Sequence, residues 1–268
     1  MRELHLFAGI GGGILGGILL GHRCVGAVEV DPYCRDVLRA RQRECCLPEF
    51  PIYGDILEFD GRPWRGRVDV VCGGFPCQPW SSAGKRLGAA DPRHLWPAMA
   101  RVVSEVCPAF VFAENVSMAA FAEPWRDLRA MGYHVPPAIQ VSAGDVGAPY
   151  KRNRWWLLAA DADRMRQLVL AVDEKVAGAS TAGDADGSRL AQQQDERGDV
   201  EARSVTASER ATRWHSQHRL RRLVSGPPAR LDARRNRIRA AGNCQVPIVA
   251  ATAFRYLMAQ LPTQQELA

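Results

Sequence analysis

The chain is organised around residues 68–84, which read Val-Asp-Val-Val-Cys-Gly-Gly-Phe-Pro-Cys-Gln-Pro-Trp-Ser-Ser-Ala-Gly. The first five residues are apolar and β-branched and stop at two glycines, which predicts a buried strand. Cys77 is therefore expected on a loop at the carboxyl end of a strand, where open α/β sheets bind ligands. Pro76 and Pro79 restrict the backbone beside this thiol. From these residues alone, Cys77 is either a buried structural cysteine or a nucleophile.

The beginning of the chain predicts the first half of a nucleotide-binding βαβ unit. A short apolar strand at residues 4–8 is followed by Gly-Ile-Gly-Gly-Gly at 9–13 and a helical run through Leu20. Glycines let the backbone approach a ligand closely, and the N-terminus of a helix favours negative charge. No Lys-Ser/Thr pair follows the glycines, which argues against a P-loop.

Acidic residues mark the ends of the next two predicted strands. Residues 25–31 end in Glu29 and Asp31, and residues 52–56 carry Asp55. Glu29 lies about 20 residues after the glycines, where dinucleotide folds bind ribose hydroxyls. Asp31 is expected to cap the following helix. These acids are otherwise ordinary solvated residues at strand ends.

The middle of the chain places a further carboxylate near Cys77. Residues 95–106 have helical spacing, and the strand predicted at 108–113 runs into Glu114-Asn115-Val116. Because neighbouring strand ends share one edge of a sheet, Glu114 is expected in the same cleft as Cys77.

Two arginines lie in the last predicted strands. Residues 141–143 and 150–159 predict a strand pair that carries Arg152 and Arg154. Their spacing puts both side chains on one face of an extended chain. They form either an ordinary basic strand face or a pair of fixed guanidiniums, suited to a base oxygen and a carboxylate.

Composition limits the class of protein. The 268 residues are 47% hydrophobic and carry a net charge of +6, with a pI near 9.0, which favours a polyanionic partner. The sequence contains no apolar run of about 18 residues, so we expect no membrane span. The first residues do not resemble a signal peptide. Eight cysteines without paired spacing predict reduced thiols and no metal site.

The motifs together resemble those of one enzyme family. Phe-Pro-Cys-Gln-Pro-Trp-Ser at 75–81 is similar to the nucleophile motif of cytosine-5 DNA methyltransferases. The glycine loop, Glu-Asn-Val at 114–116, the paired arginines and Gly-Asn at 242–243 resemble the family's other motifs, in the family's order. The resemblance covers residues 4–159 and about 221–260. In the family, the last motif folds back beside the first glycine loop.

The resemblance implies an α/β fold: a Rossmann-like class I methyltransferase with a doubly wound sheet and a small, poorly structured recognition region. Residues 1–159 would form the catalytic and cofactor-binding domain. Residues 160–222 have Trp214 as their only aromatic residue, which predicts a reduced target-recognition region or a partly disordered insert. Residues 223–268 would return to the catalytic domain and end in a helix that begins at Pro247.

The resemblance also implies the site residues. Cys77 would be the nucleophile and Glu114 the proton donor to ring nitrogen 3, while Arg154 would hold the exocyclic oxygen and Arg152 orient the loops. S-adenosylmethionine would be bound by Phe7, Gly9, Ile10, Gly11, Gly12, Glu29, Val30, Asp55, Ile56, Pro76, Leu95 and Asn243. DNA contacts would come from Gln78, Ser81, Lys85 and Arg86, which are otherwise solvated loop residues.

The implied function is methyl transfer to carbon 5 of a flipped cytosine in double-stranded DNA, through a covalent cysteine adduct. We expect a monomer in the cytoplasm of a bacterial cell, encoded by the cell or by a phage, as in restriction-modification. Two alternatives remain: the same chemistry on structured RNA, and a non-catalytic DNA-binding relative. Two residues depart from the family pattern, because His5 replaces an acid and Tyr150 replaces a glutamine.

Overall fold

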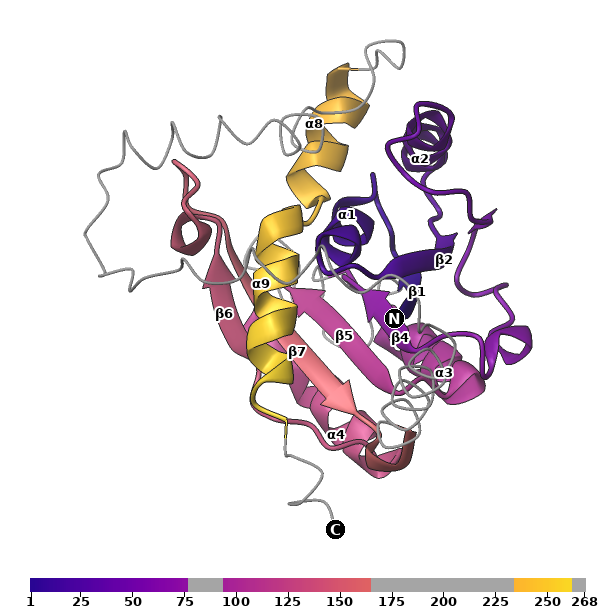
Figure 1. The fold of residues 1–268 in the computed structure, drawn as a ribbon, viewed down its shortest axis with the longest axis vertical. Helices are drawn as coiled ribbons and strands as arrows, with labels where there is room; N and C mark the ends of the chain where they lie inside the picture. The colour runs from indigo at the N-terminus through magenta and orange to yellow at the C-terminus, as the bar shows by residue number, and fades with distance from the viewer. Residues whose placement is uncertain (77–93, 165–233, 262–268) are drawn as a thin grey trace, which may run out of the picture.

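A twisted sheet forms the centre of the computed structural model, which describes residues 1–76, 94–164 and 234–261 (Figure 1). The strands run in the order β3-β2-β1-β4-β5-β7-β6. Their bounds are Arg2–Leu6 (β1), Arg23–Val28 (β2), Ile52–Tyr53 (β3), Val70–Gly73 (β4), Phe110–Asn115 (β5), Ile139–Ser142 (β6) and Asn153–Ala160 (β7). Neighbouring strands are parallel, except that β7 is antiparallel to both β5 and β6. The structure confirms the predicted doubly wound α/β sheet.

Helices cover both faces of the sheet. Their bounds are Gly12–Leu19 (α1), Pro32–Arg43 (α2), Trp96–Val106 (α3), Ala122–Ala130 (α4), Arg234–Asn243 (α8) and Pro247–Met258 (α9). One core cluster joins α3 and α4 to one face of the sheet, and two others join α9, α1 and α2 to the opposite face. Helix α9, in yellow, lies along β7 although a long stretch of sequence separates the two elements (Figure 1).

Alternation along the strands decides which side chains reach which layer. On β1, Leu4 and Leu6 face the cluster with α3, so Glu3 and His5 point to the side that carries α1 and α9. His5 is in register with Cys72 of β4, and Cys72 with Phe112 of β5. This second face therefore combines apolar packing with a buried polar row on β1, formed by Glu3 and His5. The row leads toward the carboxyl ends of the strands.

Local signals fix the helix starts. The Asp31 side chain accepts a hydrogen bond of 2.9 Å from the Tyr33 N–H, and Pro32 occupies the first turn of α2, as predicted. Helix α9 begins at Pro247, also as predicted. The strand expected at 52–56 is wrong in length, because β3 ends at Tyr53 and Asp55 accepts from the Leu57 N–H in a local turn (2.9 Å).

Glycines let α1 pack closely against its neighbours. A Cβ on Gly16 would lie 3.0 Å from the Ala250 Cβ in α9, and one on Gly17 would lie 1.9 Å from Glu3 Oε2. Helix α1 therefore touches both α9 and the polar row of β1, which a side chain at either glycine would prevent.

Two further predictions concern the domain boundaries and membrane spans. The domain boundaries at 160 and 222 depend on residues 165–233, which lie outside the described ranges, and they stay predictions. None of the described helices is both long and apolar enough to cross a membrane.

Replacing Gly17 with alanine tests the packing of α1. Alanine favours the helix by about 1 kcal/mol, but its Cβ would collide with Glu3, so we expect the free energy of unfolding to fall by about 1–3 kcal/mol. Gly242→Ala in α8 is the matched control, because no atom lies within 4 Å of its added Cβ. Urea denaturation of both variants measures the difference, and a Gly17→Ala protein as stable as the control would contradict this packing.

Candidate active site

A cavity of about 420 Å³ lies at the carboxyl ends of the central strands. The strand order reverses between β1 and β4, which is where open α/β sheets form ligand crevices. The antiparallel β7 begins at this same edge. The cavity is lined by Phe7, Gly9, Glu29, Val30, Asp31, Cys34, Gly74, Phe75, Pro76, Leu95, Glu114, Asn115, Val116, Arg154, Arg239, Ala240 and Asn243.

The glycine loop is held against the end of β2 by one carboxylate. Phe7, Gly9 and Gly11 all have positive φ angles (53°, 55° and 88°), so the loop turns sharply before α1 begins. Glu29 accepts hydrogen bonds from the Gly9 N–H (2.6 Å) and the Asp31 N–H (2.8 Å). Burial raises the pKa of Glu29, although these two bonds oppose the rise. A further donor, such as a hydroxyl in the cavity, would relieve this desolvation.

Glu114 is the buried acid of the site. It is 8% exposed, and its Oε1 lies 2.8 Å from Arg154 Nε. Despite this ion pair, Oε1 has no aligned hydrogen-bond partner among the described residues. Burial raises the pKa of Glu114, while Arg154, a hydrogen bond from Gln245 and Arg152 oppose the rise. Because burial outweighs these opposing effects, the carboxyl holds a proton more readily than an exposed glutamate does.

Asn115 fixes the start of the loop that leads to Cys77. Its Nδ2 donates to the Phe75 carbonyl (3.1 Å), and its Oδ1 accepts from the N–H groups of Val116 (2.8 Å) and Ser117 (3.3 Å). All three bonds stabilise the turn from β5 against the end of β4. This role of Asn115 was not predicted from the sequence, although its place directly after Glu114 in a recognised motif was a usable signal.

Arg152 holds the connection between α8 and α9. Its Nη2 donates to the carbonyls of Gly242 (2.6 Å) and Cys244 (2.7 Å). A Cβ on Gly12 would lie 2.0 Å from the Gln245 carbonyl oxygen, so this connection rests directly on the glycine loop. The expectation that the last motif folds back beside the first is therefore met, and Asn243 lines the cavity.

The structure brings together only part of the predicted cofactor set. Phe7, Gly9, Glu29, Val30, Pro76, Leu95 and Asn243 line the cavity, whereas Ile10, Gly11, Gly12, Asp55 and Ile56 do not. Ile56 packs into the core, and Asp55 makes the turn after β3. Cys77, Gln78, Ser81, Lys85 and Arg86 lie outside the described residues.

Arg239 is a cavity residue that the sequence analysis missed. It reaches from α8 to Asp31 and forms an ion pair there, and both residues line the cavity. The run of arginines on this helix was the signal available in the sequence.

One group of ligand-type side chains lies away from this cavity. Within the described ranges, ligand atoms of Glu3, His5 and Cys72 lie within 4.8 Å of one another. Both oxygens of Glu3 are already bonded to histidines, at 2.8 Å from His5 Nε2 and 2.7 Å from His22 Nδ1. The two hydrogen bonds hold Glu3 between the two histidines.

Several known proteins are similar in sequence to this chain. A model of the C-5 cytosine-specific DNA methylase family matches residues 1–231. The chain belongs to this family. It is 35% identical over 168 residues to the type II methyltransferase M.Eco47II of Escherichia coli, covering 60% of this chain and 39% of that protein. It is 33% identical over 168 residues to M.HhaI of Haemophilus parahaemolyticus, covering 59% and 48%. The chain thus spans less than half the length of both relatives.

Solved structures of methyltransferases share the fold of this family member. A proposed DNA modification methyltransferase from an E. coli prophage has a TM-score of 0.51 at 25% identity, covering 62% of this chain and 48% of that one. The Dnmt2 methyltransferase of S. pombe has a TM-score of 0.59 at 15% identity, covering 98% and 100%. The architecture is therefore the Rossmann-like fold of class I methyltransferases.

Changing Asn115 to aspartate tests how the loop before Cys77 is held. Aspartate can still accept from the Val116 and Ser117 N–H groups but cannot donate to the Phe75 carbonyl. We expect the free energy of unfolding to fall by about 1–3 kcal/mol, and amide exchange near Phe75 to become faster. Asn153→Ala, at an exposed position, is the control. An Asn115→Asp protein with unchanged stability and exchange would exclude this role.

Proposed function

We propose that this family member is a DNA (cytosine-5-)-methyltransferase that uses S-adenosylmethionine. The observation that carries the proposal is the buried Glu114, one oxygen of which lacks a hydrogen-bond partner within the described part of the chain, at a cavity shared with the glycine loop and Glu29. Pro76 lines the same cavity and directly precedes Cys77 in the chain. In this proposal a proton donor and the Cys77 thiol would serve one nucleoside-type site.

The residues of the cavity fit the cofactor. Its volume of about 420 Å³ lies within the range of roughly 300–1,000 Å³ that small-ligand sites occupy. Val30 is 60% exposed and, with Leu95, offers apolar surface for a purine, while Glu29 can accept from ribose hydroxyls. When bound, S-adenosylmethionine supplies the methyl group. Asp55 and Ile56 do not line the cavity, so we leave them out of the proposed contacts.

Cys77 and Glu114 would activate the cytosine together. Carbon 5 becomes nucleophilic when a thiolate adds to carbon 6, because the new C–S bond converts the ring to an enamine. Glu114 would donate its proton to nitrogen 3 as the thiolate adds, which keeps the ring neutral. After methyl transfer, a base would remove the carbon 5 proton, and water is our candidate for this base. Loss of that proton would expel the Cys77 thiolate, and the proton on nitrogen 3 would return to Glu114.

Arg154 would couple substrate binding to the protonation of Glu114. In the free protein its guanidinium opposes the rise in the Glu114 pKa that burial causes. A cytosine oxygen bound to Arg154 would share that charge and weaken its hold on Glu114. The acid would then be favoured in its protonated form when the base is present. Arg152 donates hydrogen bonds to the carbonyls of Gly242 and Cys244 and would hold the connection between α8 and α9 against the site.

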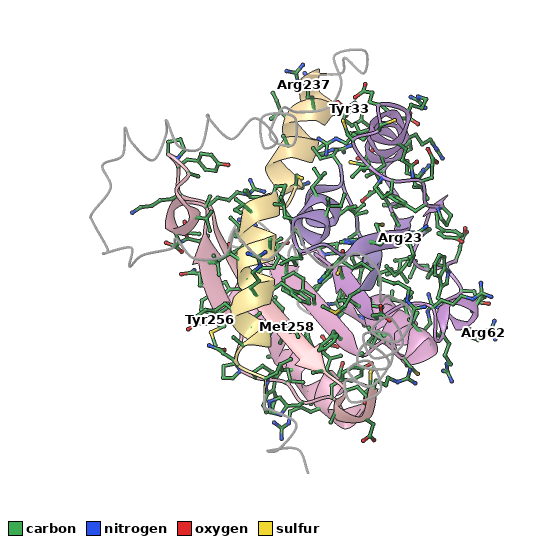
Figure 2. All side chains as sticks on the ribbon, in the orientation of Figure 1. Arg23, Tyr33, Arg62, Arg237, Tyr256 and Met258 are labelled. Atoms are coloured by element: carbon green, nitrogen blue, oxygen red, sulfur yellow. The ribbon has the colours of Figure 1, made fainter. Side chains whose placement is uncertain are left out.

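Double-stranded DNA is the proposed substrate. The chain carries a net charge of +6, and Arg235, Arg237 and Arg239 are exposed on α8. Figure 2 shows Arg237 on the part of α8 that extends beyond the sheet. The target cytosine would be flipped out of the duplex at a cost of a few kcal/mol, with Gln78, Ser81, Lys85 and Arg86 as DNA contacts. We also propose action as a monomer in the bacterial cytoplasm, within restriction-modification or as a phage enzyme.

Substitution of the two reacting groups tests the function. Cys77→Ala should abolish methyl transfer from labelled S-adenosylmethionine to unmethylated duplex DNA, while binding of the cofactor stays near normal. Glu114→Gln should slow transfer by about 10²–10⁴-fold. Cys45→Ser, at an exposed cysteine, is the matched control and should keep full activity.

The same assay separates the alternatives. Labelling of structured RNA but not of DNA would favour the RNA substrate, and no labelling of either by the unaltered protein would favour a non-catalytic DNA-binding protein. A Cys77→Ala protein that still methylates DNA would remove Cys77 from the reaction. Bisulfite sequencing of the DNA product would identify the methylated position and its sequence context.

A further inference from the structure

A buried acid with two histidine partners lies beneath the catalytic edge of the sheet. Glu3 is 2% exposed, and its two oxygens bond to His5 and His22. Burial alone would raise the pKa of Glu3, but the hydrogen bonds from His22 and His5 outweigh it and bring the pKa to about 2. Glu3 therefore stays ionised and keeps both histidines oriented. His5 stands where the family usually has an acid, so this arrangement is a property of the chain itself.

Gln245 lies between this group and Glu114. An added Cβ on Gly13 would lie 2.5 Å from Gln245 Oε1 and 3.4 Å from His5 Nδ1, so both atoms lie against the same point of α1. An added Cβ on Gly74 would lie 2.7 Å from Glu114 Oε2 and 3.1 Å from Gln245 Nε2. One end of this amide thus lies beside α1 in the neighbourhood of His5, and the other end donates a hydrogen bond to Glu114.

A small internal cavity follows the same path. Its volume is about 40 Å³, and its lining includes Glu3, His5, Gly74, Glu114 and Gln245. This is enough space for a buried water with polar partners, which needs roughly 10–15 Å³. The polar groups are therefore continuous from the β1 row to the acid of the proposed active site.

We propose that Gln245 is a positioning residue that links Glu114 to the His5–Glu3–His22 group and holds the orientation of the Glu114 carboxyl. The proposal rests on the proposed function, because it assigns a role within the same reaction. Nε2 of Gln245 is a donor only, so the oxygen that it contacts, Oε2, cannot donate a proton back to it. This hydrogen bond fixes the orientation of the carboxyl, while Oε1 stays in contact with Arg154 Nε at 2.8 Å.

The orientation of the amide follows from its surroundings. Gln245 Oε1 lies at the first turn of α1, where backbone N–H groups have no partner within the helix and attract an acceptor. Nε2 is left to point toward the carboxyl of Glu114, to which it donates. Gly13 and Gly74 are required at the two contact points because a Cβ would occupy the space of the amide.

The expected change in titration has a definite sign. The charged groups that act on Glu114 are Arg154 on β7 and Arg152, which directly precedes β7, and the thiol of Cys244 lies on the same connection as Gln245. The Gln245 hydrogen bond favours the ionised carboxylate, so its loss raises the pKa of Glu114 further. Activity that needs protonated Glu114 would then persist to higher pH, although the carboxyl would be less well oriented toward the substrate.

Gln245→Leu tests the proposal in the full chain. We expect kcat for methyl transfer to DNA to fall about 10- to 100-fold, with KM for S-adenosylmethionine within about twofold and the alkaline limb of the pH profile about one unit higher. Gln260→Leu, at an exposed position, should change none of these values. A fall in kcat with an unshifted pH profile would mean a merely structural role and would overturn the proposal.

A second measurement does not require turnover. NMR titration of carboxyl-labelled glutamate, assigned with Glu114→Gln, should show a higher pKa of Glu114 in Gln245→Leu than in the unaltered protein. Gly13→Ala, which displaces the amide, should produce the same upward shift, whereas Gly144→Ala, with only ordinary contacts, should not. If the unaltered protein methylates nothing, the proposed function fails while this titration still decides the contact; an unshifted Glu114 pKa would refute it.

Discussion

The structure depends on the close approach of helix α1 to the segments around it. Gly12, Gly13, Gly16 and Gly17 present no side chains, and the atoms that fill the vacant space belong to the 244–250 segment and to Glu3. Van der Waals contact between backbones is possible here only because the Cβ atoms are missing. The same contact fixes the glycine loop from behind, so that its other side is free to face the cavity.

Glu114 shows how opposing effects are balanced at the site. Burial favours the neutral acid, whereas two arginines and an amide favour the carboxylate, and burial is the larger effect. The result is an acid whose protonation is sensitive to whatever enters the cavity. The antiparallel β7 makes this balance possible, because it begins beside the carboxyl end of β5 with Arg154 near its start and Arg152 just before it.

The site is assembled from both ends of the chain. The first strand and its loop, the acid at the end of β5, and the connection between α8 and α9 converge on one edge of the sheet (Figure 1). Arg152 bonds across 90 residues to Gly242. Side chains that lie far apart in sequence thereby acquire a common role, and polar groups that would be costly to bury singly find partners in one another.

Most of the secondary structure could be predicted from short stretches of the amino-acid sequence. Apolar runs that end in glycines or acids specify strands and their exposed ends, and Asp31 with Pro32 specifies a helix start, because these preferences act over a few residues. The order of the motifs identified the family, Glu114 and the paired arginines. The tertiary structure alone decided that Arg152 binds backbone carbonyls, that Asp55 does not line the cavity and that Gln245 meets Glu114. These are contacts between distant segments, whose geometry depends on how the whole sheet and its helices pack.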